Sequence, residues 1–158
     1  MSPRAAARLA ALGFTHVYDY TAGKADWGSA GLPLEGDEGS ETRAAAHARR
    51  DVPRCRLGDA LQDVRAATAA AGWETCFVVD DDDVVLGRLG RKALRSTDDV
   101  LVDAVMSEGP STVRPSARLA DLVERMERQN LTSLPVTTDS GKLVGLLLRC
   151  DAEAALDR

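Results

Sequence analysis

The chain has 158 residues, of which 44% are hydrophobic, and a formal net charge of −5 at pH 7. Its Lys and Arg residues are scattered, and no apolar run approaches the roughly 20 residues that span a bilayer, which excludes nucleic acid and a membrane as main partners. Three cysteines far apart, without a CxxC pair, exclude a disulfide framework or a zinc site and indicate a reducing, cytoplasmic environment.

The first 36 residues contain a predicted helix, a strand and a second short helix. The alanine-rich helix over residues 4–12 ends at Gly13, and "HVYDY" (16–20) is typical of a strand. After the turn "TAG", the run "KADWGSAG" (24–31) predicts a short helix that ends before Pro33.

The run "LAALGFTHVYDYTAGKADWGSAGLP" (9–33) resembles the C-terminal third of a rhodanese-like domain, through its Gly-Phe-x-x-Val-x-x-Tyr-x-x-Gly pattern and the following Trp and Gly-Leu-Pro. Rhodanese chemistry needs a cysteine in a loop before the helix that begins here near Pro3. That loop would precede Met1, and all three cysteines follow the fragment, so we expect no sulfurtransferase activity. Residues 1–36 are then a structural remnant, or Met1 lies inside a longer reading frame.

Residues 37–50 are predicted to be a linker that ends in a helix. The stretch "EGDEGSETRAAAHARR" (35–50) begins polar and glycine-containing, as linkers do. It becomes helical from about Ser40 or Glu41 and leads into the next part of the chain.

The remaining sequence is an internal repeat with an offset of 58 residues. Cys55–Leu94, the first copy, aligns with Val113–Ala152, the second copy, without a gap. The identical pairs include Arg56/Arg114, Leu61/Leu119, Asp63/Asp121, Val78/Val136, Gly87/Gly145, Leu89/Leu147 and Arg91/Arg149.

Both copies predict the order β-α-β-β-α. In each, an amphipathic helix with apolar i, i+3, i+4, i+7 spacing is followed by a strand, a polar turn, a second strand and a terminal helix. The helix positions are Leu61, Val64, Ala67 and Thr68 in the first copy, and Leu119, Leu122, Val123 and Met126 in the second. The strands are 76–80 and 84–89 in the first copy, and 134–138 and 142–147 in the second. Neither copy can bury both faces of its sheet alone, so we expect the two to pack together.

The run "GPSTVRPSARLADLVERMERQNLTSLPVTTDSGKLVGLLLRCDAEAAL" (109–156), which contains the second copy, resembles a CBS (cystathionine-beta-synthase) motif, and the first copy resembles a more divergent one. The resemblance implies an α/β (α+β) fold in which motif 1 (51–97) and motif 2 (98–158) pack through their sheets as a pseudo-twofold pair. It also implies a regulatory, non-enzymatic module that forms homodimers and binds an adenosine-containing nucleotide between its motifs.

Asp151 is the first candidate ligand residue. In the family pattern Gly-x-x-Ser/Thr-x-x-Asp, which here begins at Gly145, this carboxylate accepts both ribose hydroxyls of a nucleotide. The alternative is that Asp151 caps a helix over residues 152–156. Leu148 stands where the pattern has a hydroxyl, and the first copy has Gly90 and Ala93 at the hydroxyl and acid positions, so we expect at most one site per chain.

The resemblance adds further candidate site residues, each with a structural alternative. Thr112 would contact the ligand or simply begin a strand, and Arg149 would meet phosphates or remain solvated. The apolar candidates would wall an adenine or belong to the core: Val113, Leu134, Pro135 and Val136.

No catalytic or metal site is predicted, and no cofactor is required. The acidic run "DDDD" (80–83) lacks the alternating ligands and the glycine of a calcium loop and reads as a hairpin turn. Each cysteine lies in or beside an apolar run, so Cys55, Cys76 and Cys150 are expected to be small buried residues. Two function classes remain: a module that binds an adenosine nucleotide, and a ligand-free dimerisation or interaction scaffold whose site has decayed.

Overall fold

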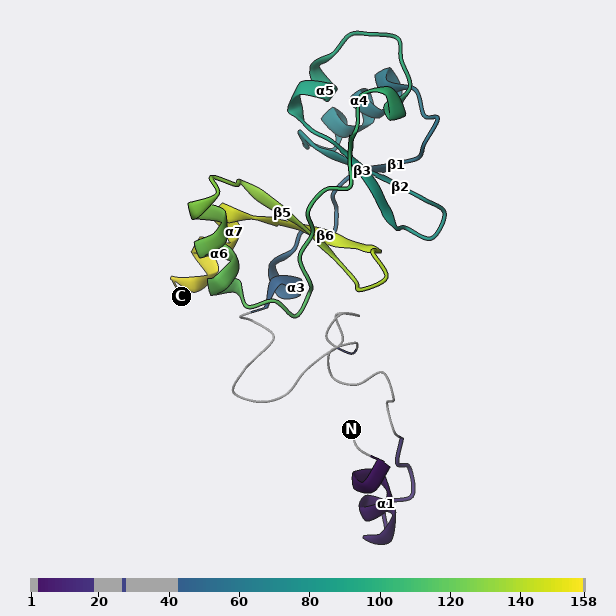
Figure 1. The fold of residues 1–158 in the computed structure, drawn as a ribbon, viewed down its shortest axis with the longest axis vertical. Helices are drawn as coiled ribbons and strands as arrows, with labels where there is room; N and C mark the ends of the chain where they lie inside the picture. Colours follow the sequence, from purple (N-terminus) through teal and green to yellow (C-terminus); the bar gives the residue numbers. More distant parts are fainter. Residues whose placement is uncertain (1–2, 19–26, 28–42, 158) are drawn as a thin grey trace.

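The computed structural model describes residues 3–18, 27 and 43–157 (Figure 1). The helices are α1 (Pro3–Ala11), α3 (Ala44–His47), α4 (Leu61–Ala70), α5 (Arg91–Arg95), the 3₁₀ turn η2 (Val102–Ala104), α6 (Leu119–Arg128) and α7 (Arg149–Leu156). The strands are β1 (Arg54–Cys55), β2 (Cys76–Val79), β3 (Val85–Leu89), β4 (Ser107–Glu108), β5 (Ser133–Thr137) and β6 (Leu143–Leu148).

The two copies have the same sheet topology. In the first copy β1 is parallel to β2, while β2–β3 and β3–β4 are antiparallel. In the second copy β5 and β6 are antiparallel, and single-residue bridges continue the sheet on both sides, Val113 to Val136 in parallel and Arg49 to Leu146 in antiparallel. Strand pairs in the first copy therefore correspond to strand pairs in the second copy at the same offset of 58 residues that aligns their sequences.

Each sheet is completed by a segment from outside its own copy. β4 pairs with β3 of the first copy although it leads into the second, and Arg49 pairs with β6 of the second copy although it leads into the first. The preceding turns follow the same exchange, because Ala44 is buried in the core of the second copy and Val102 in the core of the first. In Figure 1, α3 accordingly lies beside the second copy.

The two sheets pack face to face through an apolar cluster. Because strand side chains alternate between faces, Cys76 and Val78 of β2 face the helices of their own copy, while Phe77 and Val79 face the other sheet. The inter-sheet cluster consists of Val52, Phe77, Val79, Leu143 and Leu146, with Trp73, Val85 and Leu148 at its margin. This arrangement explains why every residue of β2 is buried.

The hairpins of the two copies also bond to each other across the pseudo-twofold axis. Val85 N donates to Gly141 O at 3.1 Å, and Leu143 N donates to Asp83 O at 2.9 Å. These two bonds are related by the offset of 58 residues. The acidic run is the first of these hairpin turns, as predicted, since Asp80 accepts from the backbone N–H groups of Asp82 and Val84.

The glycine shared by both copies allows the exchanged segments to cross the sheets. A Cβ on Gly145 would lie 2.5 Å from the carbonyl oxygen of Arg49, and a Cβ on Gly87 would lie 2.5 Å from the sulfur of Met106. At Gly145 the close atoms are backbone, so close backbone approach explains this glycine. At Gly87 the nearest atoms belong to the Met106 side chain, and the nearest backbone atom, Ser107 O, would lie 3.2 Å from the added Cβ.

The N-terminal predictions are tested only in part. α1 agrees with the predicted helix, and Gly13 follows it with φ +94°. Residues 16–18 are not in a strand, contrary to the predicted strand over 16–20, whose last two residues lie outside the described residues. Except for Trp27, the predicted second helix also lies outside them. Within the described residues, no helix has the length and apolar character needed to cross a membrane.

Candidate functional site

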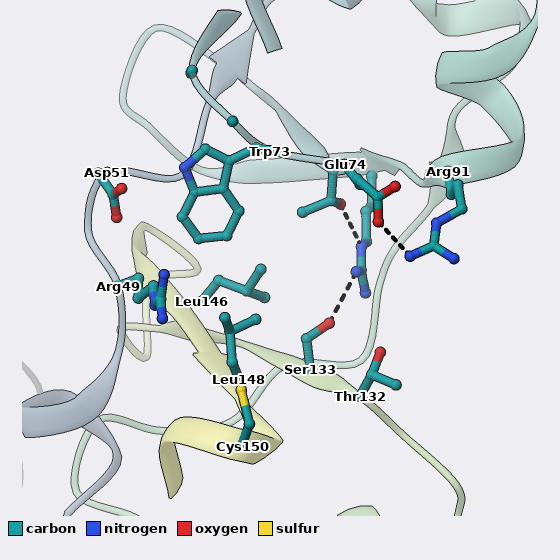
Figure 2. A pocket seen from close by; sticks show the side chains of 14 residues that line it. Arg49, Asp51, Trp73, Glu74, Arg91, Thr132, Ser133, Leu146, Leu148 and Cys150 are labelled. Carbon is teal, nitrogen blue, oxygen red and sulfur yellow. Dashed lines mark hydrogen bonds and ion pairs between the residues drawn. The ribbon is translucent and has the colours of Figure 1, made fainter. Parts of the chain in front are cut away.

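A cavity of about 670 Å³ lies between the two copies (Figure 2). This volume is in the range of small-molecule sites in proteins. Its walls come from both copies and from the segment before the first: Arg49, Asp51, Ala71, Gly72, Trp73, Glu74, Thr75, Arg88, Arg91, Thr132, Ser133, Leu146, Leu148 and Cys150. A ligand held here would contact both copies at once.

The apolar part of the cavity is formed by Trp73 together with Leu146 and Leu148 (Figure 2). Trp73 follows the end of α4, where Gly72 has φ +75° and Trp73 N donates to Thr68 O at 3.0 Å. This is a Schellman-type helix end, which fixes the direction in which the chain leaves the helix. The helix stop therefore positions the indole at the cavity.

The polar part of the cavity contains three arginines in different states. Arg91 is paired with Glu74, and Arg49 is paired with Asp151. The third is the half-buried Arg88 of β3, which donates to Thr75 Oγ1 at 2.9 Å and to Ser133 Oγ at 3.0 Å. Its guanidinium carbon also lies 5.8 Å from the centre of the Phe77 ring, within cation–π distance. Burial lowers the pKa of Arg88 below its usual value.

Asp151 is held by Arg49 rather than by a helix cap. The helix begins at Arg149, its N-cap is Leu148 without a side-chain cap bond, and Asp151 lies in the first turn. The alternative of a cap for residues 152–156 is therefore wrong. The Asp151 carboxylate accepts from Arg49 Nε at 2.6 Å and from Nη2 at 3.0 Å, a bidentate pair. The hydrogen bond from Arg49 is the main reason that the pKa of Asp151 lies below its usual value.

The backbone fixes the position of Arg49. Arg49 N donates to Leu146 O, and Leu146 N donates to Arg49 O, both at 2.9 Å. The backbone of Arg49 is therefore anchored on β6, while its side chain forms the pair with Asp151.

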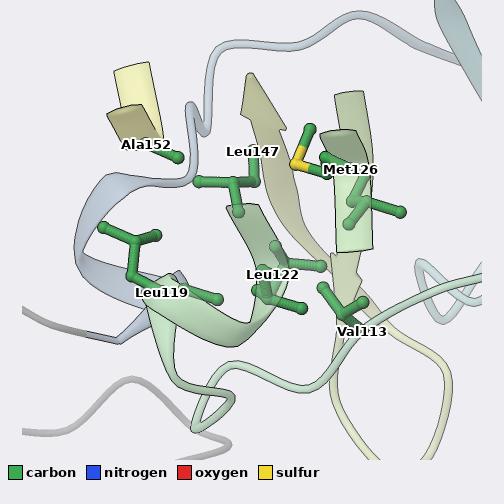
Figure 3. Packing of buried hydrophobic residues seen from close by; sticks show 9 residues of the cluster. Val113, Leu119, Leu122, Met126, Leu147 and Ala152 are labelled. Atoms are coloured by element: carbon green, nitrogen blue, oxygen red, sulfur yellow. The ribbon is translucent and has the colours of Figure 1, made fainter. Parts of the chain in front are cut away.

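The apolar candidates predicted from the sequence lie in the protein interior. Val113, Leu134 and Val136 belong to the core of the second copy, under α6 and α7, where Figure 3 shows Val113 among Leu122, Met126 and their neighbours. Pro135 is also buried, and its carbonyl accepts from Val113 N at 2.9 Å.

The structure does not bring the polar candidates together. Thr112 accepts from Thr137 Oγ1 at 2.9 Å at the hairpin end of β5, whereas Asp151 follows the partner of Ser133 at the other end. Thr137 and Ser133 are four residue steps apart along β5, which is about 13 Å. Arg149 pairs with Glu153 at 3.3 Å. None of the seven predicted site residues is among those that line the cavity.

The residues that line the cavity were missed for identifiable reasons. Arg88 is a charged residue in the otherwise apolar strand "VLGRL" and aligns with Leu146, while Trp73 aligns with Leu131. A comparison of the two copies would have singled out these two positions, because their residue types differ between the copies. The prediction of three buried cysteines is also wrong in part, because Cys55 and Cys76 are buried but Cys150 is exposed beside the cavity.

Comparison with known proteins agrees with this geometry. Residues 102–157 match the family model described as "CBS domain". No curated protein matches the chain.

Solved structures, including those of CBS pairs, share the fold of the whole repeat. CBSX2 from Arabidopsis thaliana, crystallised with AMP, is 22% identical with a TM-score of 0.62, over 73% of this chain and 96% of that one. The cytosolic domain of the Mg²⁺ channel MgtE in complex with ATP is also 22% identical, with a TM-score of 0.66 over 72% of this chain. A CBS domain pair with 5′-methylthioadenosine and S-adenosyl-L-methionine is 14% identical, with a TM-score of 0.62 over 73% of this chain.

The similarity establishes the CBS-pair fold. The predicted packing of two motifs through their sheets is confirmed. The chain spans about half, 48%, of the MgtE chain that it matches. The resemblance of residues 9–33 to a rhodanese-like domain stays a prediction from sequence.

Proposed function

We propose that this chain is a regulatory, non-enzymatic module that binds an adenosine-containing nucleotide in the cavity between its two copies. The observation that carries the proposal is the cavity itself, which combines an aromatic and aliphatic wall with arginine side chains and takes residues from both copies. A purine ring suits the first part and an anionic group suits the second.

Proteins with this fold have been crystallised with AMP, with ATP and with S-adenosyl-L-methionine, which supports an adenosine ligand as the class. A ligand between the copies favours one relative arrangement of the two sheets over others, and a bound partner would read out that difference. Action as a homodimer in the cytoplasm, without nucleic acid or a membrane as partner, remains part of the proposal from the sequence.

The second candidate function is a ligand-free dimerisation or interaction scaffold. Two observations favour it: Leu148 places an apolar side chain where the family pattern has a hydroxyl, and Asp151 is already paired with Arg49. A ribose would have to displace the Arg49 donors from that carboxylate.

A thermal-shift series with AMP, ADP, ATP, NAD and S-adenosylmethionine separates the two functions. A ligand at 100 times its Kd stabilises the fold by about 2.7 kcal/mol. We expect at least one ligand to raise Tm, and we expect Trp73→Ala to abolish that rise because it removes the aromatic wall. Tyr18→Ala is the matched control, since Tyr18 is 83% exposed and lies outside the cavity. If no ligand shifts Tm at millimolar concentration, the scaffold function is correct.

A further inference from the structure

Arg88 is the cavity arginine whose charge no carboxylate balances. In the described part of the chain Arg49 is paired with Asp151 and Arg91 with Glu74. Arg88 contacts only two hydroxyl groups and the Phe77 ring there, and it forms no ion pair within the described residues. A half-buried guanidinium without a counter-ion is costly unless a ligand supplies the negative charge. The remaining acid of the cavity, Asp51, lies on the Arg49 side in Figure 2, away from Ser133.

The two hydroxyls around Arg88 have different roles. Thr75 Oγ1 accepts from Arg88 Nε and donates its proton to Leu89 O at 3.0 Å, so it positions the guanidinium and has no proton left for a ligand. Ser133 Oγ accepts from Arg88 Nη2, which leaves its own O–H available as a donor. Arg88 has five N–H groups, and these two bonds use two of them.

The two hydroxyl groups that hold Arg88 come from different copies. Thr75 and Ser133 are equivalent positions of the repeat, one before β2 and one in β5, yet both contact the same guanidinium. The position equivalent to Arg88 in the second copy is Leu146, so the arrangement exists once per chain. Trp73 and Leu148 form the apolar wall of the same cavity.

We propose that Arg88 and Ser133 bind a phosphate group, so that the ligand of this cavity is a phosphorylated nucleoside rather than a neutral nucleoside or a cationic sulfonium compound. The inference rests on the proposed function, because it assigns the charge of the ligand that the cavity takes. Arg88 presents its free N–H groups to the phosphate oxygens, and the Ser133 hydroxyl adds a bond from the other copy. Phosphate binding would thereby strengthen an existing link between the two copies.

The test is isothermal titration calorimetry of the full chain with AMP, adenosine, S-adenosylmethionine and inorganic pyrophosphate at fixed ionic strength. We expect wild type to bind AMP at least about tenfold more tightly than adenosine, since hydrogen bonds to a charged group are the stronger kind. Arg88→Gln should remove most of this advantage and leave adenosine affinity within about twofold. Arg128→Gln is the matched control, an exposed arginine of α6 paired with Glu124, and should change neither ligand.

Arg88 also joins the two copies, so its variants are compared with Ser133→Ala, which keeps the guanidinium and removes only the hydroxyl. We expect Ser133→Ala to weaken AMP selectively as well. Equal affinity for AMP and adenosine in wild type, or an equal loss of both in Arg88→Gln, overturns the phosphate assignment while the proposed function stands. Binding of pyrophosphate that depends on Arg88, without binding of any nucleoside, supports the anion site and removes the proposed function. If none of the four compounds binds, both proposals fail.

Discussion

At the scale of single residues, the pair between Arg49 and Asp151 determines which group the Asp151 carboxylate in the first turn of α7 binds. The family pattern assigns Asp151 to ribose, but in this structure both carboxylate oxygens accept from Arg49. In the absence of a ligand Asp151 therefore has a structural role, because it holds the side chain of Arg49, the residue that pairs with β6. A ribose would compete for the same oxygens.

The Arg49–Asp151 pair predicts a pH-dependent contribution to stability. Arg49 holds the pKa of Asp151 below its usual value, so the contribution is fully present above the unfolded pKa and is lost as pH falls through the folded pKa. Asp151→Asn should therefore be less stable than wild type near neutral pH, and the difference should disappear in acid. Urea unfolding at several pH values measures it.

The matched control for this prediction is Arg49→Gln, which removes the partner but keeps the carboxylate. In the Arg49→Gln background, Asp151→Asn should produce no pH-dependent difference. A difference that persists unchanged in that background would show that Asp151 is stabilised by another group.

At the scale of the elements, the crossing of residues 44–49 over β6 depends on a glycine. A methyl group on Gly145 would meet the backbone of Arg49, and backbone cannot move aside as a flexible side chain can. We expect Gly145→Ala to destabilise the fold by about 1–3 kcal/mol, as overpacking does. Urea unfolding checks this, together with faster amide exchange at Arg49 and Leu146.

Gly90→Ala is the control for Gly145→Ala. Gly90 has no heavy atom within 4 Å of the position of an added Cβ, and its φ is negative. Gly90 is the N-cap of α5, so this substitution should cost at most the roughly 1 kcal/mol typical of an alanine at that position. Equal effects of the two substitutions would mean that Gly145 serves backbone flexibility rather than the close approach of residues 48–49.

The sequence predicted the elements of the repeat well because their signals are local. The apolar spacing of Leu61, Val64 and Thr68 marks α4, and the strands agree with the predicted runs within one residue or two at most. The start of α7 was placed three residues too late, because propensity does not determine the first turn of a helix.

The exchanged segments and the cavity were beyond sequence reasoning for a different reason. Arg49 and Leu146 are 97 residues apart, and nothing in "AHARR" indicates which strand it joins. The site prediction followed the family pattern to Thr112 and Asp151, which lie at opposite ends of β5 and β6. Arg88 and Trp73 differ from their equivalents in the second copy, and only the packing of the two sheets shows that both line one cavity.

At the scale of the whole molecule, the exchanges and the inter-sheet cluster make the two copies one structural unit. Ala44 completes the core of the second copy, Val102 completes that of the first, and Phe77 is fully buried between the sheets. Neither copy keeps its core covered if the other unfolds. Local opening of one copy should therefore expose the other, in contrast to two independent domains on a linker.

This unity is tested by damaging each core separately. Leu61 is buried in the first copy and Leu147 in the second, each with at most 1% of its surface exposed. Leu61→Ala and Leu147→Ala should each cost about 2–5 kcal/mol through lost burial and the cavity left behind. Because the copies share their segments and one inter-sheet cluster, either substitution should lower a single unfolding transition. Hydrogen exchange should then accelerate equally in β3 and β6 in both variants. If Leu61→Ala accelerates exchange in β3 while β6 keeps wild-type protection, the copies unfold independently and the exchanged segments do not couple them.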